Sequence, residues 1–232
     1  IPHVYRMADS FRRRGKTVVI GGYHGSALPE EALQHADFVV VGEAEGLWPQ
    51  ILKEIADGGV KQKIYKNAEP IEMYNMAIPR RDLLDQKMYS VPSTIQATRG
   101  CPFNCEFCTV TKFFGRSYRI RPVAEVVDEI KSSPDRFWMF LDDNLVGDAV
   151  YAKSLFKALI PLQVTWGAQT SFTITTDPEL MDLYAAAGGR YAFIGFESIT
   201  ADTLNSMRKR FNKPDKYAGG VLELHRRGIT IM

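Results

Sequence analysis

Apolar runs and amphipathic segments alternate along the first 58 residues. Residues 17–20 and 38–41 are short apolar runs typical of buried strands, and each is followed by a glycine-containing segment. Helices are expected at residues 3–14, 29–34 and 48–56. The order α-β-α-β-α predicts part of a doubly wound parallel α/β sheet.

From residue 93 onward, strands and helices alternate as regular repeats. Strand-like runs lie at 94–98, 137–141, 165–170, 191–196 and from residue 229. Helical segments follow at 123–130, 149–160, 178–187, 202–207 and 215–227. This alternation predicts most of a partial (β/α)6 barrel, in which functional groups lie at the carboxyl ends of the strands.

Residues 59–92 separate the two patterns. They contain Pro70, Pro79 and Pro92 without a sustained period, so we expect a linker with short elements. The predicted domains are the C-terminal half of a Rossmann-like domain at 1–58, a linker at 59–92 and a partial barrel at 93–232. The chain begins at Ile1 and stops within an apolar run, so we expect a fragment of a longer protein.

Composition narrows the functional classes. The chain is 45% hydrophobic and 24% charged with a net charge of +2, which is ordinary for a globular protein and gives no indication of nucleic-acid binding. No apolar run approaches the roughly 20 residues of a membrane helix, so no transmembrane segment is expected. Three closely spaced cysteines argue against a disulfide scaffold and for a reducing compartment, and we expect a cytoplasmic protein.

All three cysteines lie in one short stretch, spaced C-x3-C-x2-C at Cys101, Cys105 and Cys108. Thiolates clustered this tightly indicate a metal or iron–sulfur site. The chain has no fourth cysteine, and its four histidines are distant in sequence. The simplest interpretation is a [4Fe–4S] cluster whose fourth iron is open to a small molecule. A zinc site completed by a remote histidine and three incidental buried thiols are the alternatives.

The cysteine spacing, with Phe107 directly before Cys108 and the lead-in Ala-Thr-Arg-Gly-Cys-Pro-Phe-Asn-Cys, resembles the signature of the radical S-adenosylmethionine (SAM) superfamily. The resemblance implies that the three thiolates hold a [4Fe–4S] cluster and that SAM chelates its unique iron. It implies further that reduction of the cluster cleaves SAM to a 5′-deoxyadenosyl radical, which abstracts a substrate hydrogen. Phe107 is expected to shield the cluster.

Two carboxylates follow the second predicted strand of the barrel, Asp142 and Asp143. The superfamily has a motif here whose polar groups bind the SAM ammonium, and carboxylates suit a cationic amine. Both residues are therefore candidate SAM ligands. The alternative is a cap for the helix that follows, since Asp before a helix is commonplace.

The third and fourth strand ends carry further candidates implied by the resemblance. Gln169 and Ser171 stand where related enzymes often have an arginine that meets the SAM carboxylate, so Arg119 or Arg121 is considered as its replacement. Glu197, within a Gly-Phe-Glu-Ser motif, is expected to meet the hydroxyls of the SAM ribose.

The first segment resembles the C-terminal half of the cobalamin-binding domain that precedes many radical SAM domains. The residues considered for cobalamin are Gly21, Gly22, His24, Gly42 and Glu43. In that family the double glycine lies against the nucleotide tail of cobalamin. The histidine is not expected to be a cobalt ligand; a loop histidine making a hydrogen bond is the preferred interpretation.

Four cations without an acidic residue lie between the last cysteine and Pro122: Lys112, Arg116, Arg119 and Arg121. They are either a solvated loop or a surface that neutralises the cluster and SAM or receives a flavodoxin- or ferredoxin-type electron donor.

The predicted function is that of a radical SAM enzyme acting on a small molecule, with cobalamin-dependent C-methylation or a related radical transformation as the reaction. One alternative is a radical SAM enzyme whose Rossmann-like domain serves interaction and binds no cobalamin. The other is a zinc-stabilised, non-catalytic binding protein. The sequence identifies no acid or base for the substrate.

Overall fold

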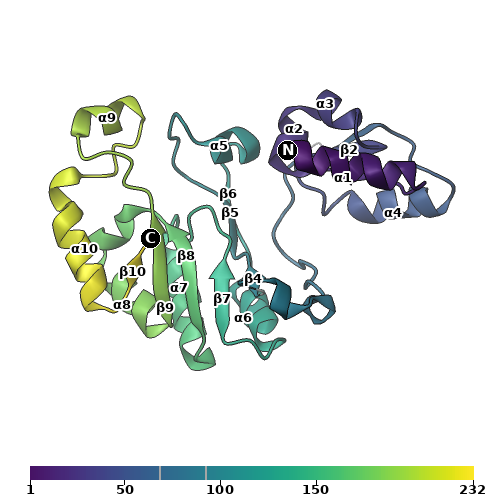
Figure 1. Ribbon diagram of the computed structural model, residues 1–232. Helices are drawn as coiled ribbons and strands as arrows, with labels where there is room; N and C mark the ends of the chain where they lie inside the picture. Colours follow the sequence, from purple (N-terminus) through teal and green to yellow (C-terminus); the bar gives the residue numbers. More distant parts are fainter. Residues whose placement is uncertain (68, 92) are drawn as a thin grey trace. The chain divides into compact units, whose positions relative to one another are not determined.

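The computed structural model describes residues 1–67, 69–91 and 93–232; Ala68 and Pro92, both in the predicted linker, lie outside the described residues. The chain divides into two compact units, Ile1–Glu72 and Met73–Met232 (Figure 1). Among the described residues, no helix has both the length and the apolar character that crossing a membrane requires.

The first unit is built on a three-stranded parallel sheet. Its strands, in spatial order, are β1 (Val19–Ile20), β2 (Phe38–Val41) and β3 (Ile64–Lys66). Its helices are α1 (Pro2–Arg13), α2 (Gly22–Ala27), α3 (Pro29–Leu33) and α4 (Trp48–Ala56).

Strand β2 forms the centre of this unit because both of its faces are buried. Val39 packs with Tyr5 of α1 and Ala32 of α3, whereas Phe38 packs in a separate cluster with Ile51 of α4. A strand covered on both faces is a continuous apolar run, which is the pattern that predicted it. The expected doubly wound α/β arrangement is confirmed.

Two features of the first unit differ from the sequence prediction. The predicted first domain ends at residue 58, but β3 lies beyond that point and pairs with β2 from Val39 to Val41. A strand of only three residues is too short to give a clear hydrophobic period. In addition, the expected glycine loop at 21–24 is largely helical, because α2 begins at Gly22 with Gly21 as its N-cap.

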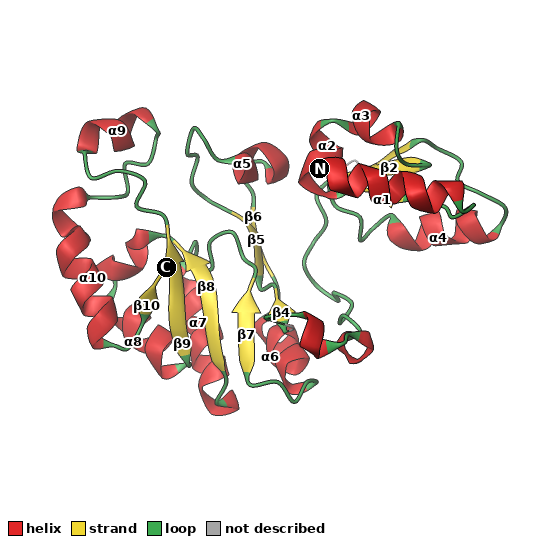
Figure 2. Cartoon of the chain, in the orientation of Figure 1, coloured by secondary structure: helices red, strands yellow, loops and turns green. Residues whose placement is uncertain are grey.

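The second unit contains a five-stranded parallel sheet (Figure 2). In spatial order its strands are β10 (Thr230–Ile231), β9 (Gly189–Ile194), β8 (Thr165–Thr170), β7 (Phe137–Phe140) and β4 (Thr94–Ile95). The α-helices between them are α6 (Val123–Lys131), α7 (Ala149–Leu159), α8 (Pro178–Ala186), α9 (Ala201–Ser206) and α10 (Tyr217–Arg226). This is the predicted sequence of strands and helices.

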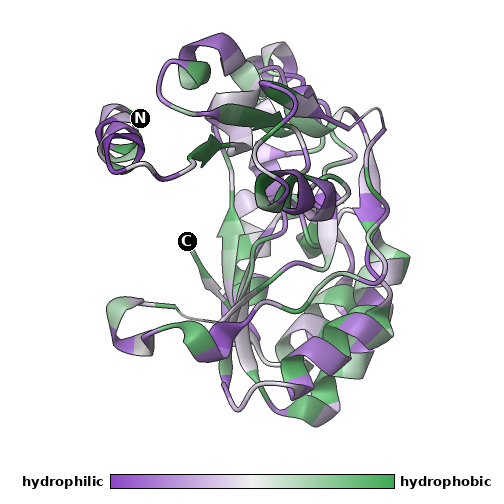
Figure 3. Ribbon diagram, turned by 90° about the vertical axis from the view of Figure 1, so that its right-hand side faces the viewer, coloured by the Kyte–Doolittle hydropathy of each residue, from purple (hydrophilic) through white to green (hydrophobic). Residues whose placement is uncertain are grey.

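Short 3-10 helices complete the second unit. They are η1 (Arg81–Leu83), η2 (Gln86–Met88), η3 (Ile160–Leu162), η4 (Phe172–Thr176) and η5 (Pro214–Lys216). The helices carry hydrophilic and hydrophobic residues side by side (Figure 3), as expected for helices that cover a sheet with one face only.

The first predicted strand of the barrel is split in two. Only β4 joins the large sheet, whereas β5 (Thr98–Gly100) pairs antiparallel with β6 (Tyr118–Ile120). Gly100 allows this pairing: its φ is +88°, and a Cβ there would collide with the carbonyl oxygen of Ser117. The cysteines therefore lie in an excursion between β5 and β6, which also contains an unpredicted helix, α5 (Thr109–Phe114).

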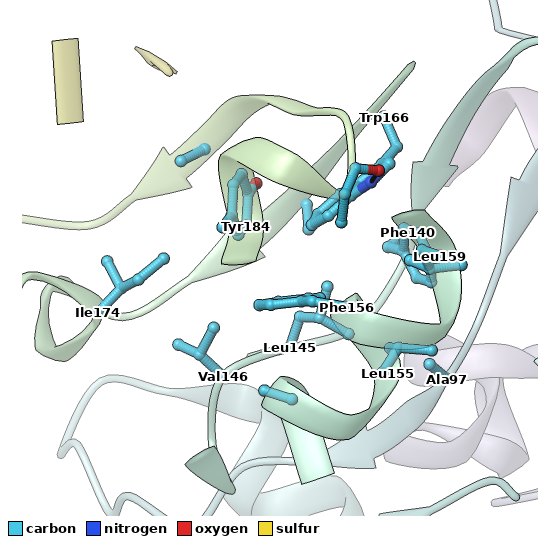
Figure 4. Close-up of a cluster of buried hydrophobic side chains, with 14 of the residues drawn as sticks. Ala97, Phe140, Leu145, Val146, Leu155, Phe156, Leu159, Trp166, Ile174 and Tyr184 are labelled. Carbon is cyan, nitrogen blue, oxygen red and sulfur yellow. Dashed lines mark hydrogen bonds between the residues drawn. The ribbon is translucent and has the colours of Figure 1, made fainter. Parts of the chain in front are cut away.

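A core of large aromatic side chains fixes the sheet against its helices (Figure 4). The ring of Trp166 on β8 lies 4.3 Å from Tyr184 of α8 and 5.3 Å from Phe156 of α7, measured between ring centroids. The buried indole N–H donates to the Ala187 carbonyl at 2.8 Å. Each such aromatic pair adds about 0.5–1.5 kcal/mol beyond area burial, so the strands that carry the candidate site are firmly held.

Candidate active site

The three cysteines occupy one loop, residues 101–108, which we call the cysteine loop. Cys101 directly follows β5, and Cys108 is the N-cap of α5. The Cys108 amide donates to the Cys105 carbonyl at 3.2 Å, which closes the loop into a turn. All three thiols are partly buried and form no disulfide.

The electrostatics of the loop fit a bound cationic group. Burial raises the pKa of the Cys101 thiol, and the charge of Cys108 raises it further. Burial is also the largest cause that raises the pKa of Cys105, and the charges of the two other thiols add to it. Three thiolates this close repel one another unless positive charge lies between them, as the irons of a cluster would provide.

The three thiols are also compared with the ligand sets of single metal ions. In the described ranges, no three His, Cys, Asp or Glu side chains converge as ligands of one metal ion. In a [4Fe–4S] cluster each thiolate binds a different iron, so the sulfurs stand farther apart than the ligands of one zinc ion. Three free cysteines on one loop are a donor set of the kind that holds a [4Fe–4S] cluster.

The end of β7 supports the entrance of the loop through Asp142. This carboxylate is fully buried and accepts hydrogen bonds from the Ala97 amide at 3.2 Å, from the Thr98 amide and from the Thr98 hydroxyl at 2.6 Å. Burial raises the pKa of Asp142 to about 7, and the hydrogen bonds oppose that rise. Asp142 thus holds the junction of β4 and β5, and its contacts do not support the expected role as a ligand of the SAM ammonium.

Asp143 is the carboxylate of this pair that is partly exposed. It accepts a hydrogen bond from the Gly100 amide at 2.9 Å, directly before the first cysteine. Burial raises the pKa of Asp143, and the hydrogen bond from Gly100 and the charge of Arg99 oppose that rise.

Asn144 joins the cysteine loop to the end of β8, a role that the sequence prediction missed. Its side-chain amide donates to the Cys101 sulfur at 3.8 Å, and its side-chain oxygen accepts from the Ser171 amide at 3.0 Å. A hydrogen bond to a ligand sulfur orients it and tunes the bound cluster. The signal in the sequence was an amide directly after two aspartates at a strand end.

The residues expected to bind the SAM carboxylate have different surroundings in the structure. Gln169 is exposed, and the Ser171 hydroxyl is hydrogen-bonded to Thr173 at 2.6 Å. Arg119 on β6 lies over the Phe114 ring at 5.7 Å. Arg121 is buried and paired with Glu129 at 2.5 Å, so it is engaged in the packing of α6 and is not placed as a SAM ligand.

Glu197 lies just beyond β9 in a conformation unusual for its type. Its φ is +62°, a region that costs a non-glycine residue about 1–3 kcal/mol. The carboxylate pairs with the ammonium of Lys209 at 2.8 Å, and a third of the side chain is exposed. The turn that follows β9 therefore presents a carboxylate paired with Lys209, and the contact of Glu197 with the SAM ribose stays a prediction.

A segment after α9, residues 207–211, supports the cysteine loop from a second side; we call it the seat segment. The Glu106 amide donates to the Met207 carbonyl at 2.9 Å, and the Phe103 ring stacks on Phe211 at 3.8 Å between centroids. Lys209 lies 5.8 Å from the ring centroid of Phe107, which is half exposed. The sequence prediction missed these contacts, because the basic run at 208–210 does not show in the sequence what it packs against.

The glycines considered for cobalamin lie in the first unit. Gly22 and Gly42 have φ values of +80° and +79°, and the Gly42 amide donates to the Ser26 hydroxyl at 2.9 Å. Gly21 lies beside β2, with the Val40 carbonyl 3.4 Å from the place of a Cβ.

The two polar residues considered for cobalamin are engaged within the first unit. His24 makes a hydrogen bond of 2.9 Å with the Tyr5 hydroxyl and a contact of 3.2 Å with Glu31. Glu43 accepts a hydrogen bond from the Ile71 amide at 3.0 Å. These contacts agree with a locally bonded histidine and not with a cobalt ligand.

The family of the chain follows from comparison with known proteins. Residues 95–232 match the family model of the Radical SAM superfamily, which is more than half of the chain. The chain therefore belongs to the radical SAM superfamily, and the three cysteines stand within the matched region.

Among curated proteins, the chain is similar to a methyltransferase. The chain is 34% identical over 239 residues to bacteriochlorophyllide d C-12(1)-methyltransferase of Chlorobaculum tepidum, covering 99% of this chain and 52% of that enzyme. The chain thus spans about half the length of this curated relative.

Solved structures of radical SAM enzymes have a similar fold, and each match covers nearly the whole of this chain. The radical SAM methyltransferase TsrM from Kitasatospora setae, solved with tryptophan and a SAM analogue, matches with a TM-score of 0.82 at 19% identity, covering 98% of this chain and 51% of that one. The cobalamin-dependent radical SAM enzyme OxsB, solved with aqua-cobalamin and SAM, matches with a TM-score of 0.78 at 16% identity, covering 99% and 38%. The predicted fold class is confirmed.

Proposed function

We propose that the chain binds a [4Fe–4S] cluster and SAM, and that the protein transfers a methyl group to a carbon of a small molecule with cobalamin as its second cofactor. The observation that carries the proposal is the cysteine loop: three partly buried thiols in one turn, at the carboxyl edge of a parallel sheet in a radical SAM chain. When bound, the cluster supplies the electron that cleaves SAM, and all other steps below concern residues of this chain.

Cys101, Cys105 and Cys108 would hold the cluster. Asn144 orients the first of these sulfurs, and the hydrogen bonds of Asp142 fix the strand junction that leads into the loop. These contacts within the protein position the loop for the cluster, which lowers the cost of ordering it.

Asp143 and Glu197 are the residues we propose for SAM. Both are partly exposed carboxylates at strand ends, one after β7 and one after β9. Asp143 suits the ammonium of SAM, and Glu197 suits the ribose hydroxyls. Arg119, Gln169 and Ser171 remain candidates for the SAM carboxylate, and Phe107 remains the candidate shield of the cluster.

Cobalamin is proposed for the first unit. Support comes from the doubly wound sheet, from the left-handed glycines Gly22 and Gly42 at strand ends, and from the likeness of the whole chain to a cobalamin-dependent enzyme. Gly21, His24 and Glu43 line the same strand-end segments. The relative that methylates bacteriochlorophyllide suggests a tetrapyrrole or another largely apolar small molecule as substrate.

An electron donor of the flavodoxin or ferredoxin type would dock on the excursion that carries the cysteines. Lys112 and Arg116 are exposed there, on α5 and just after it. Cations around a cluster attract an acidic donor and raise the association rate. Cysteines that must stay reduced favour a cytoplasmic location.

Anaerobic reconstitution tests the central proposal. The purified protein should take up about four irons and four sulfides per chain and release 5′-deoxyadenosine from SAM with dithionite. Alanine at any one of the three cysteines should abolish both, whereas R208Q, on the exposed face of the seat segment, should retain both. One tightly held zinc without SAM cleavage would refute the radical proposal.

Hydroxocobalamin binding tests the second cofactor. We expect saturable binding by the protein, followed by its absorption spectrum. A reconstituted protein that cleaves SAM but binds no cobalamin would leave the radical chemistry intact and assign the first unit to an interaction role.

A further inference from the structure

Lys209 is the one lysine of the described residues that is buried. Only 8% of the residue is exposed, although lysine is almost never buried without a partner. Its partner is Glu197, whose carboxylate oxygen lies 2.8 Å from the ammonium. Breaking such a pair by removing one member leaves an uncompensated charge, so the pair is costly to disturb.

The ammonium also faces the cysteine loop. It lies 5.8 Å from the ring centroid of Phe107, which precedes Cys108, and 5.7 Å from that of Phe211, which stacks on Phe103. Cations within about 6 Å of an aromatic face are attracted to it. Lys209 therefore contacts the loop through one ring and the loop's support through another.

The charge of Lys209 lies beside the cluster-binding part of the loop. Its ammonium faces the ring of Phe107, and Phe107 stands between Cys105 and Cys108 in the sequence. The other charged pair of this region, Arg208 with Glu106 at 3.0 Å, is about 60% exposed on both sides. Solvent screens that pair, whereas the charge of Lys209 acts through a drier medium.

A buried cation beside a cluster favours the state with the extra electron. A cluster held by three thiolates gains negative charge when it accepts an electron, and its potential depends on net charge and solvent exposure around it. Lys209 neither gives nor takes the electron in this step.

We propose that Lys209 is a positioning residue of the cluster site, which holds Phe107 and Glu197 in place and raises the reduction potential of the cluster. The proposal rests on the proposed function, since it presupposes a cluster on the three cysteines. It assigns to the charge of Lys209 the task of making one-electron reduction by a flavodoxin- or ferredoxin-type donor more favourable, while Glu197 is the ion-pair partner of that charge.

The test is a potentiometric titration of the reconstituted protein, followed by the electron paramagnetic resonance signal of the reduced cluster. K209M should lower the equilibrium constant of reduction about tenfold, which is about 59 mV for one electron. K209R should restore the wild-type value, because it keeps the charge. R208Q, the matched control one residue away, should leave the potential unchanged.

E197Q keeps the proposal testable if K209M fails to fold. It removes the negative partner while keeping the cation, so the potential should rise. A K209M or E197Q cluster with the wild-type potential would overturn the proposal, as would an equal shift in R208Q. Failure of the wild-type protein to assemble a cluster would instead refute the proposed function itself.

Discussion

The cysteine loop has two supports of opposite character. On the side of β7, Asp142 is fully buried and bonded mainly to backbone amides of the strand junction. On the side of the seat segment, the loop is held by one backbone hydrogen bond, a ring stack and a buried ammonium. The first support joins one buried carboxylate mainly to backbone amides, whereas the second depends largely on contacts between side chains, several of them from a segment far along the sequence. The first should therefore govern folding and the second the properties of the site.

The largest effect is expected from D142A. It leaves the Ala97 and Thr98 amides and the Thr98 hydroxyl without their acceptor in a buried place, which should cost about 3 kcal/mol or more. Urea unfolding of the protein before reconstitution measures this. D143A is the matched control, because it removes the acceptor of only the Gly100 amide and should cost about 1 kcal/mol. Equal losses in the two variants would contradict the contrast.

The pH dependence of stability reports on the same carboxylate. The pKa of Asp142 is raised in the folded state to about 7, so the folded protein binds this proton more tightly than the unfolded chain. The stabilisation that comes from this proton on Asp142 is fully present below about pH 4, the pKa of an unfolded aspartate. It is lost as the pH rises through 7. Because the Ala97 and Thr98 groups keep Asp142 as their acceptor at either pH, the loss of stability with pH should be smaller than the loss in D142A.

Unfolding free energies at pH 5 and pH 8 check this dependence. The wild type should lose stability relative to D142N over that range. A difference between the two proteins that is constant with pH would show that Asp142 does not titrate there.

The ring stack of the second support should give a coupling of about 1 kcal/mol. The single variants F103L and F211L and their double variant form a cycle, and the loss in the double variant should be less than the sum of the single losses. Unfolding by urea again provides the free energies. Strict additivity would mean that the stack contributes nothing beyond apolar burial.

The smallest effect is expected from the exposed pair of Glu106 and Arg208. Such pairs contribute about 0.2–1 kcal/mol, and less in high salt. R208Q should therefore shift the unfolding midpoint only slightly at low salt and not at 1 M sodium chloride. A large loss that persists in salt would place this pair among the main supports of the loop.

The contrast between the supports also explains what the sequence could reveal. Buried strands such as Phe38–Val41 and Phe137–Phe140, and helices such as Trp48–Ala56, follow from local hydrophobic period and were predicted closely. Strand β3 and the β5–β6 pair escaped prediction, because three-residue strands are defined by their partners and carry no period of their own.

The same limit applies to the site. The three cysteines and the strand-end carboxylates could be identified from the sequence, because their residue types indicate their chemistry. The burial of Asp142 and Lys209 could not be predicted, because the sequence does not show whether a charged side chain is solvated or enclosed. The motif around Glu197 located a strand end correctly, but its partner twelve residues later depends on the path of the chain through α9.

The seat segment has a consequence for biosynthesis. It lies about a hundred residues after the last cysteine, so a growing chain presents the three thiols well before the residues that hold them are made. At roughly 5–20 residues per second, that interval lasts about 5–20 s. During this interval the cysteine loop is connected to β5 but is not yet in contact with the seat segment. Delivery of iron and sulfide would therefore yield a correctly enclosed cluster only after Phe211 has been added and folded back, which makes cluster insertion a late event in the life of the nascent protein.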